Sequence, residues 1–154
     1  MEAIRSEARR SYAALGPLFC PYLNDVVHFR NDGFEHLLFK RKDKPRSPAE
    51  QYTRLRMLPL AGEVIRKSHT LQEFSQQTAT VRQQSANRWE KKAKAVNYYV
   101  FTAIIRPRVR IKVVIREIEG GVKHFYSLFP SWRVETDTNG KLTKALYSDD
   151  PADL

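Results

Sequence analysis

The chain has 154 residues, 42% hydrophobic and 29% charged, which suits one globular domain with a hydrophobic core and argues against wholesale disorder. Its 27 Lys+Arg against 17 Asp+Glu give a formal net charge of +10, an excess that attracts polyanions such as nucleic acid, although a solvated basic surface without a dedicated ligand is the alternative. A single cysteine, Cys20, excludes an internal disulfide and a cysteine-rich zinc site. The sequence shows no signal peptide and no long apolar run, which predicts a cytoplasmic protein that does not enter a membrane.

The N-terminal segment, residues 2–15, predicts an amphipathic helix that Gly16-Pro17 ends. Its apolar residues recur at spacings of three and four: Ile4, Ala8, Tyr12 and Leu15. Val26–Phe29 then predicts a short strand, closed by a turn at Asn31–Gly33. One or two helical turns are expected over Phe34–Phe39.

A basic loop is expected over residues 40–46, which carry five cations and one acid. The next helix has a clear start, because Ser47-Pro48-Ala49-Glu50 combines an N-cap serine, proline at the first position and glutamate at the third. An apolar stripe follows, with Tyr52, Leu55 and Leu58, and Pro59 is expected to kink or restart the helix.

A polar, Gln-rich segment over about residues 70–95 predicts an exposed helix or a mobile insert. A second capping-box pattern, Thr70–Glu73, opens it, and its apolar stripe is thin. Its end, RWEKKAK, could contact a DNA backbone.

From residue 96 the sequence becomes rich in β-branched and aromatic residues, which predicts strands in NYYVFTAIIR, RVRIKVVIREI and VKHFYSLF. Short connections favour an antiparallel meander, and a further hairpin is expected to turn at Asn139-Gly140, with Lys141–Tyr147 returning. The acidic end, residues 148–154, predicts a frayed tail. The expected fold class is α+β in one domain over residues 1–154: N-terminal helices followed by a curled antiparallel sheet of about four strands.

The strand RVRIKVVIRE alternates in character, with one apolar face and one basic face. The basic face carries Arg106, Arg108, Arg110, Lys112 and, further along, Arg116. A solvent-exposed polar face is the ordinary explanation of such a pattern. The absence of an acid among these cations favours phosphate binding, for which Lys40 and Arg41 are further candidates.

The partner strand carries His124, Tyr126 and Ser127, and its register decides what they face. A three-residue loop, Glu119–Gly121, would pair Arg116 with His124 and bring Tyr126 to the basic face. A two-residue loop, Gly120-Gly121, would pair Arg116 with Phe125 and turn His124 and Tyr126 to the other face. We favour the three-residue loop, because it also sets opposite charges against each other.

His36 and His124 could therefore converge among cations, an arrangement suited to metal-free RNA cleavage. One histidine would take the proton of the 2′-hydroxyl and the other would protonate the leaving 5′-oxygen. Arg or Lys would stabilise the phosphoryl oxygens, and Tyr126 or Ser127 could donate hydrogen bonds there. A structural role is the commoner fate of a histidine near an apolar stretch. No motif for a metal or cofactor site is present, and none is expected.

The chain resembles the phage-associated branch of the Barnase–EndoU–colicin–RelE-like nuclease superfamily, in the segments VVHFRNDGFEHLLFKR, RLRMLPLAGEVI and IKVVIREIEGGVKHFYSLF. The resemblance covers roughly residues 17–67 and 96–132. It implies helices followed by a curled antiparallel sheet, metal-free RNA cleavage and carriage on mobile elements. It also implies that His36 matches the histidine after the first strand, and that Lys112, His124 and Ser127 lie on strands where polar catalytic groups occur.

The leading hypothesis is a toxin-like or phage-derived ribonuclease that uses His36, His124, Tyr126 and Ser127. An acidic inhibitor protein is a conceivable partner. A non-catalytic nucleic-acid-binding protein using the same basic face is the alternative, and a protein that docks on an acidic partner is the third.

Overall fold

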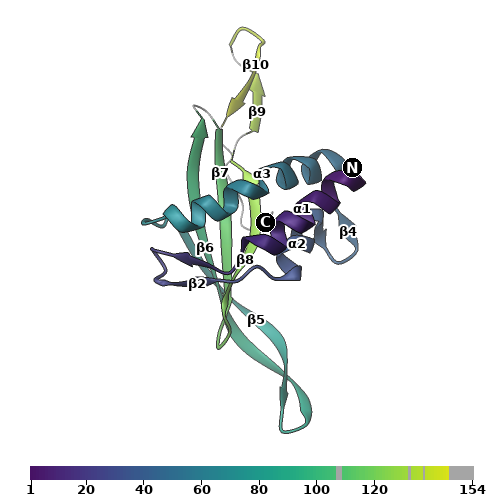
Figure 1. Cartoon of the computed structure of the whole chain (residues 1–154), viewed down its shortest axis with the longest axis vertical. Coiled ribbons are helices and arrows are strands. Elements are labelled where there is room, and N and C mark those ends of the chain that lie inside the picture. Colours follow the sequence, from purple (N-terminus) through teal and green to yellow (C-terminus); the bar gives the residue numbers. More distant parts are fainter. Residues whose placement is uncertain (107–108, 132, 137, 146–154) are drawn as a thin grey trace.

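The computed structural model describes residues 1–106, 109–131, 133–136 and 138–145 (Figure 1). Within these residues the elements run in the order α1 (Glu2–Leu15), β1 (Leu18–Cys20), β2 (Asp25–Val27), α2 (Asn31–Leu38), β3 (Phe39–Arg41), β4 (Lys44–Pro45), α3 (Pro48–Lys67), β5 (Glu73–Ser85), β6 (Arg88–Arg106), β7 (Val109–Ile118), β8 (Lys123–Pro130), β9 (Arg133–Thr136) and β10 (Leu142–Ala145). Helices in the N-terminal part precede an antiparallel sheet, so the α+β class is confirmed.

The main sheet has four antiparallel strands in the order β5-β6-β7-β8. The helices pack on one of its faces (Figure 1). Alternate residues of β7 point to this face, where Ile111, Val113 and Ile115 are buried with the helices. The apolar side of the strand therefore packs inward, as its period of two predicts.

The predicted first helix is confirmed as α1, with Ala8 and Tyr12 buried. The capping box before α3 is also confirmed: Glu50 N–H donates to Ser47 Oγ at 3.2 Å, and Ser47 N–H donates to the Glu50 carboxylate at 3.0 Å. The helix continues through Pro59 to Lys67 without a break, so the expected restart is wrong. Tyr52, expected on the apolar stripe, is exposed.

Two predictions in the first third of the chain need correction. Asn31–Gly33 does not close a strand with a turn, because these residues form the first turn of α2. The strand over Val26–Phe29 is shorter than expected, since β2 ends at Val27. Beyond it, the backbone of His28 forms a parallel bridge to β8, accepting from Phe125 N–H at 2.8 Å and donating to Lys123 O at 2.9 Å. The free edge of β8 is partly covered in this way.

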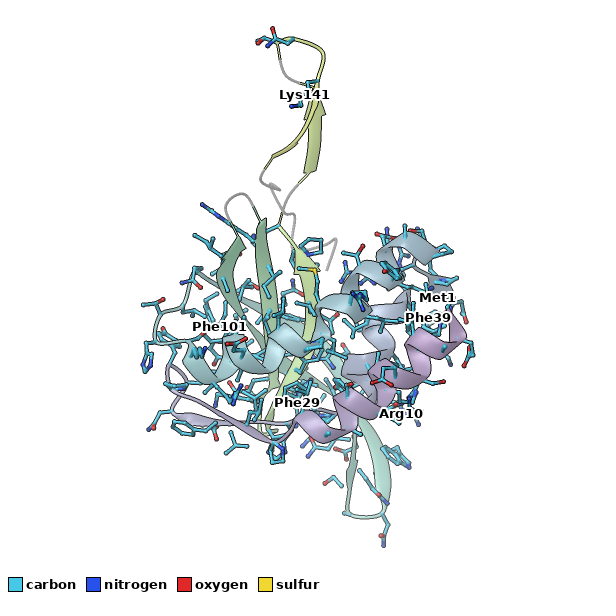
Figure 2. The ribbon with its side chains drawn as sticks, turned by 45° about the horizontal axis from the view of Figure 1, so that its top comes forward. Met1, Arg10, Phe29, Phe39, Phe101 and Lys141 are labelled. Carbon is cyan, nitrogen blue, oxygen red and sulfur yellow. The ribbon has the colours of Figure 1, made fainter. Side chains whose placement is uncertain are left out.

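The Gln-rich segment, predicted to be an exposed helix or a mobile insert, is not helical. Glu73–Ser85 forms β5, which pairs along its whole length with β6. The second capping-box pattern therefore starts no helix, because the cross-strand pairing of this long hairpin overrides the local signal. The hairpin extends beyond the body of the molecule (Figures 1 and 2).

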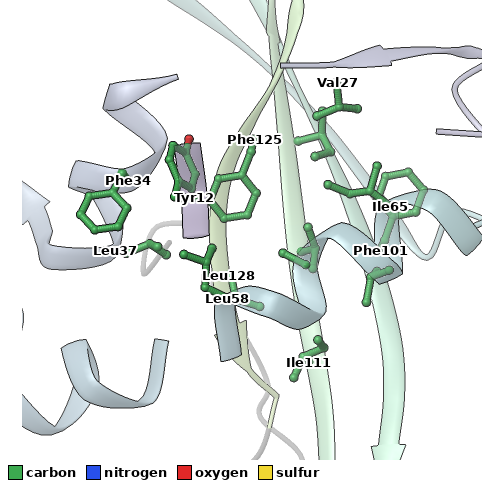
Figure 3. Packing of buried hydrophobic residues seen from close by; sticks show 14 of the residues in the cluster. Tyr12, Val27, Phe34, Leu37, Leu58, Ile65, Phe101, Ile111, Phe125 and Leu128 are labelled. Carbon is green, nitrogen blue, oxygen red and sulfur yellow. The ribbon is translucent and has the colours of Figure 1, made fainter. Parts of the chain in front are cut away.

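The main core lies between the helices and the sheet (Figure 3). Tyr12 of α1 and Phe34 of α2 pack with ring centroids 5.4 Å apart, and Tyr12 lies 5.9 Å from Phe125 of β8. Gly33 allows this approach, because a Cβ atom there would collide with the Phe125 carbonyl oxygen and stand 2.7 Å from Tyr12 Oη. The glycine thus fixes how closely α2 can approach β8.

The far face of the sheet has a smaller apolar cluster of Val100, Val114 and Phe129, with Tyr98 and Tyr126 against it. A separate hairpin, β9–β10, stands away from the crowded side chains of the body (Figure 2). Gly140, with a φ of 78°, belongs to its turn, so this predicted hairpin is confirmed over the described residues. Tyr147, the acidic tail at 148–154 and Arg108 lie outside the described residues.

Candidate functional site

The hairpin between β7 and β8 has the register that the three-residue loop predicts. Arg116 pairs with His124, and on either side of this pair Glu117 faces Lys123 and Ile115 faces Phe125. The register then shifts by one residue, so that Ser127 lies opposite Val114 and Tyr126 is the extra residue of a β-bulge. Such a bulge re-aims the side chains around it, which here are those of the candidate site.

His124 is completely buried, and both of its ring nitrogens are engaged. Nε2 accepts a hydrogen bond from Arg116 Nε at 3.0 Å, and Nδ1 lies 3.2 Å from the carbonyl oxygen of Val122. This geometry fits a neutral imidazole whose proton sits on Nδ1. Burial lowers the pKa of His124, as does the positive charge of Arg116, and this outweighs the bond to Val122. The ring is thus placed to hold Arg116.

Arg116 contacts three side chains, two on β8 and one on α2. Besides His124, its Nη2 donates to the Asp32 carboxylate on α2 at 3.2 Å. Its guanidinium carbon also lies 4.6 Å from the centre of the Tyr126 ring, a cation–π contact. The cation is therefore fixed in orientation, as a phosphate ligand needs to be.

His36 reaches the same tyrosine from α2. Its ring stacks on Tyr126 with centroids 4.2 Å apart and an interplanar angle of 26°. The ring is half-buried, and both nitrogens are shielded from solvent. His36 and His124 are consequently linked by a continuous chain of contacts through Tyr126 and Arg116, although 88 positions separate them in the numbering of the sequence.

Arg46, which the sequence patterns did not single out, lies beside this cluster. Its side chain is 2% exposed, and its Nε donates to the carbonyl oxygen of His36 at 3.0 Å. Its two terminal nitrogens are buried without a hydrogen-bond acceptor among the described residues. Burial lowers the pKa of Arg46, against the opposing effects of Glu50 and Tyr126. The sequence gives no sign of this burial, because Arg46 is one cation among several in a basic segment.

Tyr126 is the common contact of the site. Burial raises the pKa of its hydroxyl, as does the neighbouring Tyr98, while the charges of Arg116 and Arg46 act to lower it. Its ring also packs on Tyr98 with centroids 5.4 Å apart. A tyrosine hydroxyl is protonated at neutral pH, and the raised pKa does not change this, so the Tyr126 hydroxyl is available as a hydrogen-bond donor.

Ser127 is buried and contacts α3. Its Oγ accepts from Arg54 Nη1 at 3.1 Å, and the same nitrogen donates to Leu128 O at 3.1 Å. Arg54 is another buried cation that the sequence patterns missed, because it lies at a position of α3 where an apolar residue is the usual choice. The bond to Arg54 ties α3 to β8.

Cations on both faces of the sheet have acidic partners from other strands and from α2. Lys112 Nζ lies 3.0 Å from Glu73 of β5, and Lys123 Nζ lies 2.9 Å from both Asp25 and Glu117. Hydrogen bonds from Lys123, Asn97 and Tyr99 lower the pKa of Glu117 despite its burial. The strand face has no acid of its own, but Lys112 and Arg116 are paired with acids from β5 and α2.

The remaining phosphate candidates lie on several elements. Lys40 and Arg41 are exposed on β3, and Arg110 of β7 is half-buried. Arg106 ends β6 and is not part of β7. Among the phosphate candidates whose side chains the structure describes, Lys40 and Arg41 are thus the best placed to meet a polyanion from solvent.

Two surface hollows lie away from His36 and His124, one between α3 and β6 near His69 and the other between α1 and α3 near Ile4. Among the described residues no group of three or more His, Cys, Asp or Glu side chains is close enough to hold a metal ion. Within the same part of the chain, no helix combines the length and the apolar character that a membrane crossing requires.

Comparisons with models of known protein families, with curated proteins and with solved structures find no match for this chain. The resemblance to the nuclease superfamily therefore stays a prediction from short sequence segments.

Proposed function

We propose that the protein is a cytoplasmic, metal-independent ribonuclease whose centre is the cluster of His36, Tyr126, Arg116 and Arg46. The observation that carries the proposal is the stacking of His36 on the tyrosine ring that also receives Arg116, with His124 holding the arginine from behind. A titratable imidazole, a hydroxyl donor and two arginines are the groups that phosphodiester cleavage by proton transfer needs.

In the proposed reaction, His36 takes the proton of the 2′-hydroxyl, whose oxygen attacks the adjacent phosphorus. The bond from phosphorus to the 5′-oxygen breaks as His36 gives the proton that it took to that oxygen, so the products are a 2′,3′-cyclic phosphate and a 5′-hydroxyl. Arg116 and Arg46 stabilise the charge on the phosphoryl oxygens, and Tyr126 donates a hydrogen bond. His124 acts as a positioning residue, because both of its nitrogens are engaged.

A non-catalytic RNA-binding protein is the second candidate. One observation favours it: the ring nitrogens of His36 are shielded, and those of His124 are occupied. A general base must reach the substrate proton, so the ribonuclease proposal requires RNA to gain access to His36.

The deciding experiment is the cleavage of total RNA by the purified protein in excess EDTA. The informative variant is His36→Phe, which keeps an aromatic ring against Tyr126 but removes the proton-transfer nitrogens. His69→Ala, at an exposed histidine of the loop after α3, is the matched control. We expect a loss of cleavage of at least about 100-fold in His36→Phe, since general acid–base groups contribute roughly 10²–10⁴.

Cleavage at the wild-type level by His36→Phe, or intact RNA with the wild-type protein, would contradict the ribonuclease proposal. Intact RNA together with a salt-sensitive gel shift would instead support the RNA-binding candidate. Mapping the ends as 2′,3′-cyclic phosphate and 5′-hydroxyl checks the chemistry of the reaction independently of its rate.

A further inference from the structure

The hairpin formed by β5 and β6 continues beyond the four-stranded sheet. Ile118, the last residue of β7, lies opposite Val96, so residues 78–95 form a two-stranded ribbon, here called the arm. Its pairing runs from Thr78–Ala95 to Ser85–Arg88, eight residue pairs that span about 23 Å at the usual rise of a strand. Figures 1 and 2 show the arm projecting from the body.

The arm carries an excess of positive charge, which does not stabilise the pairing of its two strands. It carries five cations (Arg82, Arg88, Lys91, Lys92 and Lys94) and one acid, Glu90. Arg82 lies directly opposite Lys91, and like charges in that position destabilise a strand pair. Within the described residues Arg82, Lys91 and Lys92 have no ion pair. An anionic partner would relieve this repulsion.

One face of the arm combines these charges with an aromatic ring. Cross-strand pairs two positions apart share a face, so the pair Arg82–Lys91 lies beside the pair Gln84–Trp89. The guanidinium of Arg82 lies 5.5 Å from the centre of the Trp89 ring, which agrees with this placement. Trp89 is 64% exposed, and Glu90 belongs to the opposite face. The face thus offers an open aromatic surface, two cations and an amide.

The base of the arm is fixed beside the hairpin that carries His124. Glu119 N–H donates to Ala95 O at 2.9 Å, and Lys94 Nζ donates to Glu119 O at 3.3 Å. Glu119 begins the turn between β7 and β8, five residues before His124. A strand of RNA bound along the arm would therefore extend to the turn at Glu119. This turn precedes β8, the strand that carries His124 and Tyr126.

We propose that the arm is a docking element for single-stranded RNA, in which Trp89 stacks on an unpaired base while Arg82 and Lys91 contact the flanking phosphates. This inference rests on the proposed function for its ligand class. Aromatic rings beside cations are how proteins bind single strands without reading a sequence, because every base offers a π face. A-form duplex RNA does not admit a ribbon into its deep, narrow groove, whereas B-DNA does.

The test is the affinity of the full chain for a fluorescein-labelled 15-nucleotide RNA of unstructured sequence, measured by fluorescence anisotropy. The RNA is 2′-O-methylated throughout, so the proposed cleavage cannot occur during the titration. We expect Trp89→Ala to bind at least about tenfold more weakly, as the loss of one stacked base implies. Tyr52→Ala, at an aromatic residue of α3 that is 46% exposed, is the matched control and should bind within twofold of the wild type.

The charges are tested by their salt dependence. In Arg82→Gln/Lys91→Gln the slope of log K against log salt should become shallower by about 1.4, because each phosphate contact on a single strand contributes about 0.7. Arg56→Gln/Lys67→Gln removes the same formal charge from exposed positions of α3 and should leave the slope unchanged. All four substituted side chains of the two pairs are exposed, and circular dichroism of each variant checks the fold.

Wild-type affinity in Trp89→Ala, an unchanged slope in the charge variant, or tighter binding of duplex DNA of equal length would overturn the proposal. So would a failure of the wild type to bind the RNA. If the arm variants lose affinity while natural RNA stays intact with the wild type, the docking role stands and the ribonuclease proposal fails. If the wild type cleaves RNA and the arm variants bind RNA as tightly as the wild type, the ribonuclease proposal stands and the docking role of the arm fails.

Discussion

Arg116 donates its Nε–H to Nε2 of His124 across the β7–β8 hairpin, at 3.0 Å. An acceptor nitrogen cannot carry a proton, so this bond holds the imidazole in its neutral form while the imidazole holds the arginine in place. The partner that the hairpin register gives to His124 therefore assigns the histidine a supporting role in the site. In the proposed reaction the proton-transfer role therefore belongs to His36.

Loss of the His124 ring should weaken the fold and the site together. In His124→Leu the Nε–H of Arg116 loses its acceptor in a largely buried setting, and we expect the free energy of unfolding to fall by about 1–3 kcal/mol. Urea denaturation followed by circular dichroism measures this loss. His124→Gln, whose Oε1 can accept from Arg116, should recover part of the stability and of any cleavage activity. Equal losses in both variants would contradict a role based on this hydrogen bond.

The stability of the protein should fall as the pH drops below about 6.5. Burial keeps the pKa of His124 in the folded protein below its ordinary value of about 6.5, so the unfolded chain takes up the proton more readily. Each pH unit in this range costs up to about 1.4 kcal/mol. Denaturation at pH 7.5, 6.5, 5.5 and 5.0 should give a flatter dependence for His124→Gln than for the wild type. The lowered pKa values of Asp25 and Glu117 act in the same direction, at more acidic pH.

The close approach of α2 to β8 should be intolerant of one added methyl group. A Cβ atom in Gly33→Ala meets the backbone oxygen of Phe125, which cannot move without shifting the strand, and we expect a loss of about 2–3 kcal/mol. Gly62→Ala on α3 is the matched control. Its Cβ meets only the side-chain ends of Leu15 and Leu18, at 3.1 and 3.3 Å, and alanine favours the helix. Similar denaturation midpoints for the two variants would show that α2 has more room than the structure gives it.

Local signals in the sequence were sufficient where the contacts are local. The capping box at Ser47 and the β7–β8 hairpin follow from residues a few positions apart, and the charges of Glu117 and Lys123 select the register. The strand β5 and the part of β6 before residue 96 were missed because these polar segments lack the β-branched and aromatic pattern of a buried strand. The strand β5 is instead stabilised by its continuous pairing with β6.

The long-range parts of the site had no local signal. Nothing in the sequence near Arg46 indicates burial against α2, and the acids that compensate the sheet cations come from distant elements, such as Glu73 for Lys112. The convergence of His36 with Tyr126 depends on how α2 docks against β8. Periodicity predicts which face of an element is apolar, and it leaves open which element covers that face.

The order of the elements also bears on synthesis. The helices leave the ribosome first, yet the ring that Tyr12 and Phe29 pack against belongs to Phe125, about 100 residues later. Until β8 is made, the apolar sides of α1 and α2 have no sheet to cover them, and a chain stalled before that point exposes them to other nascent chains. Completion of the core and completion of the candidate site are the same late event, so an unfinished chain has neither.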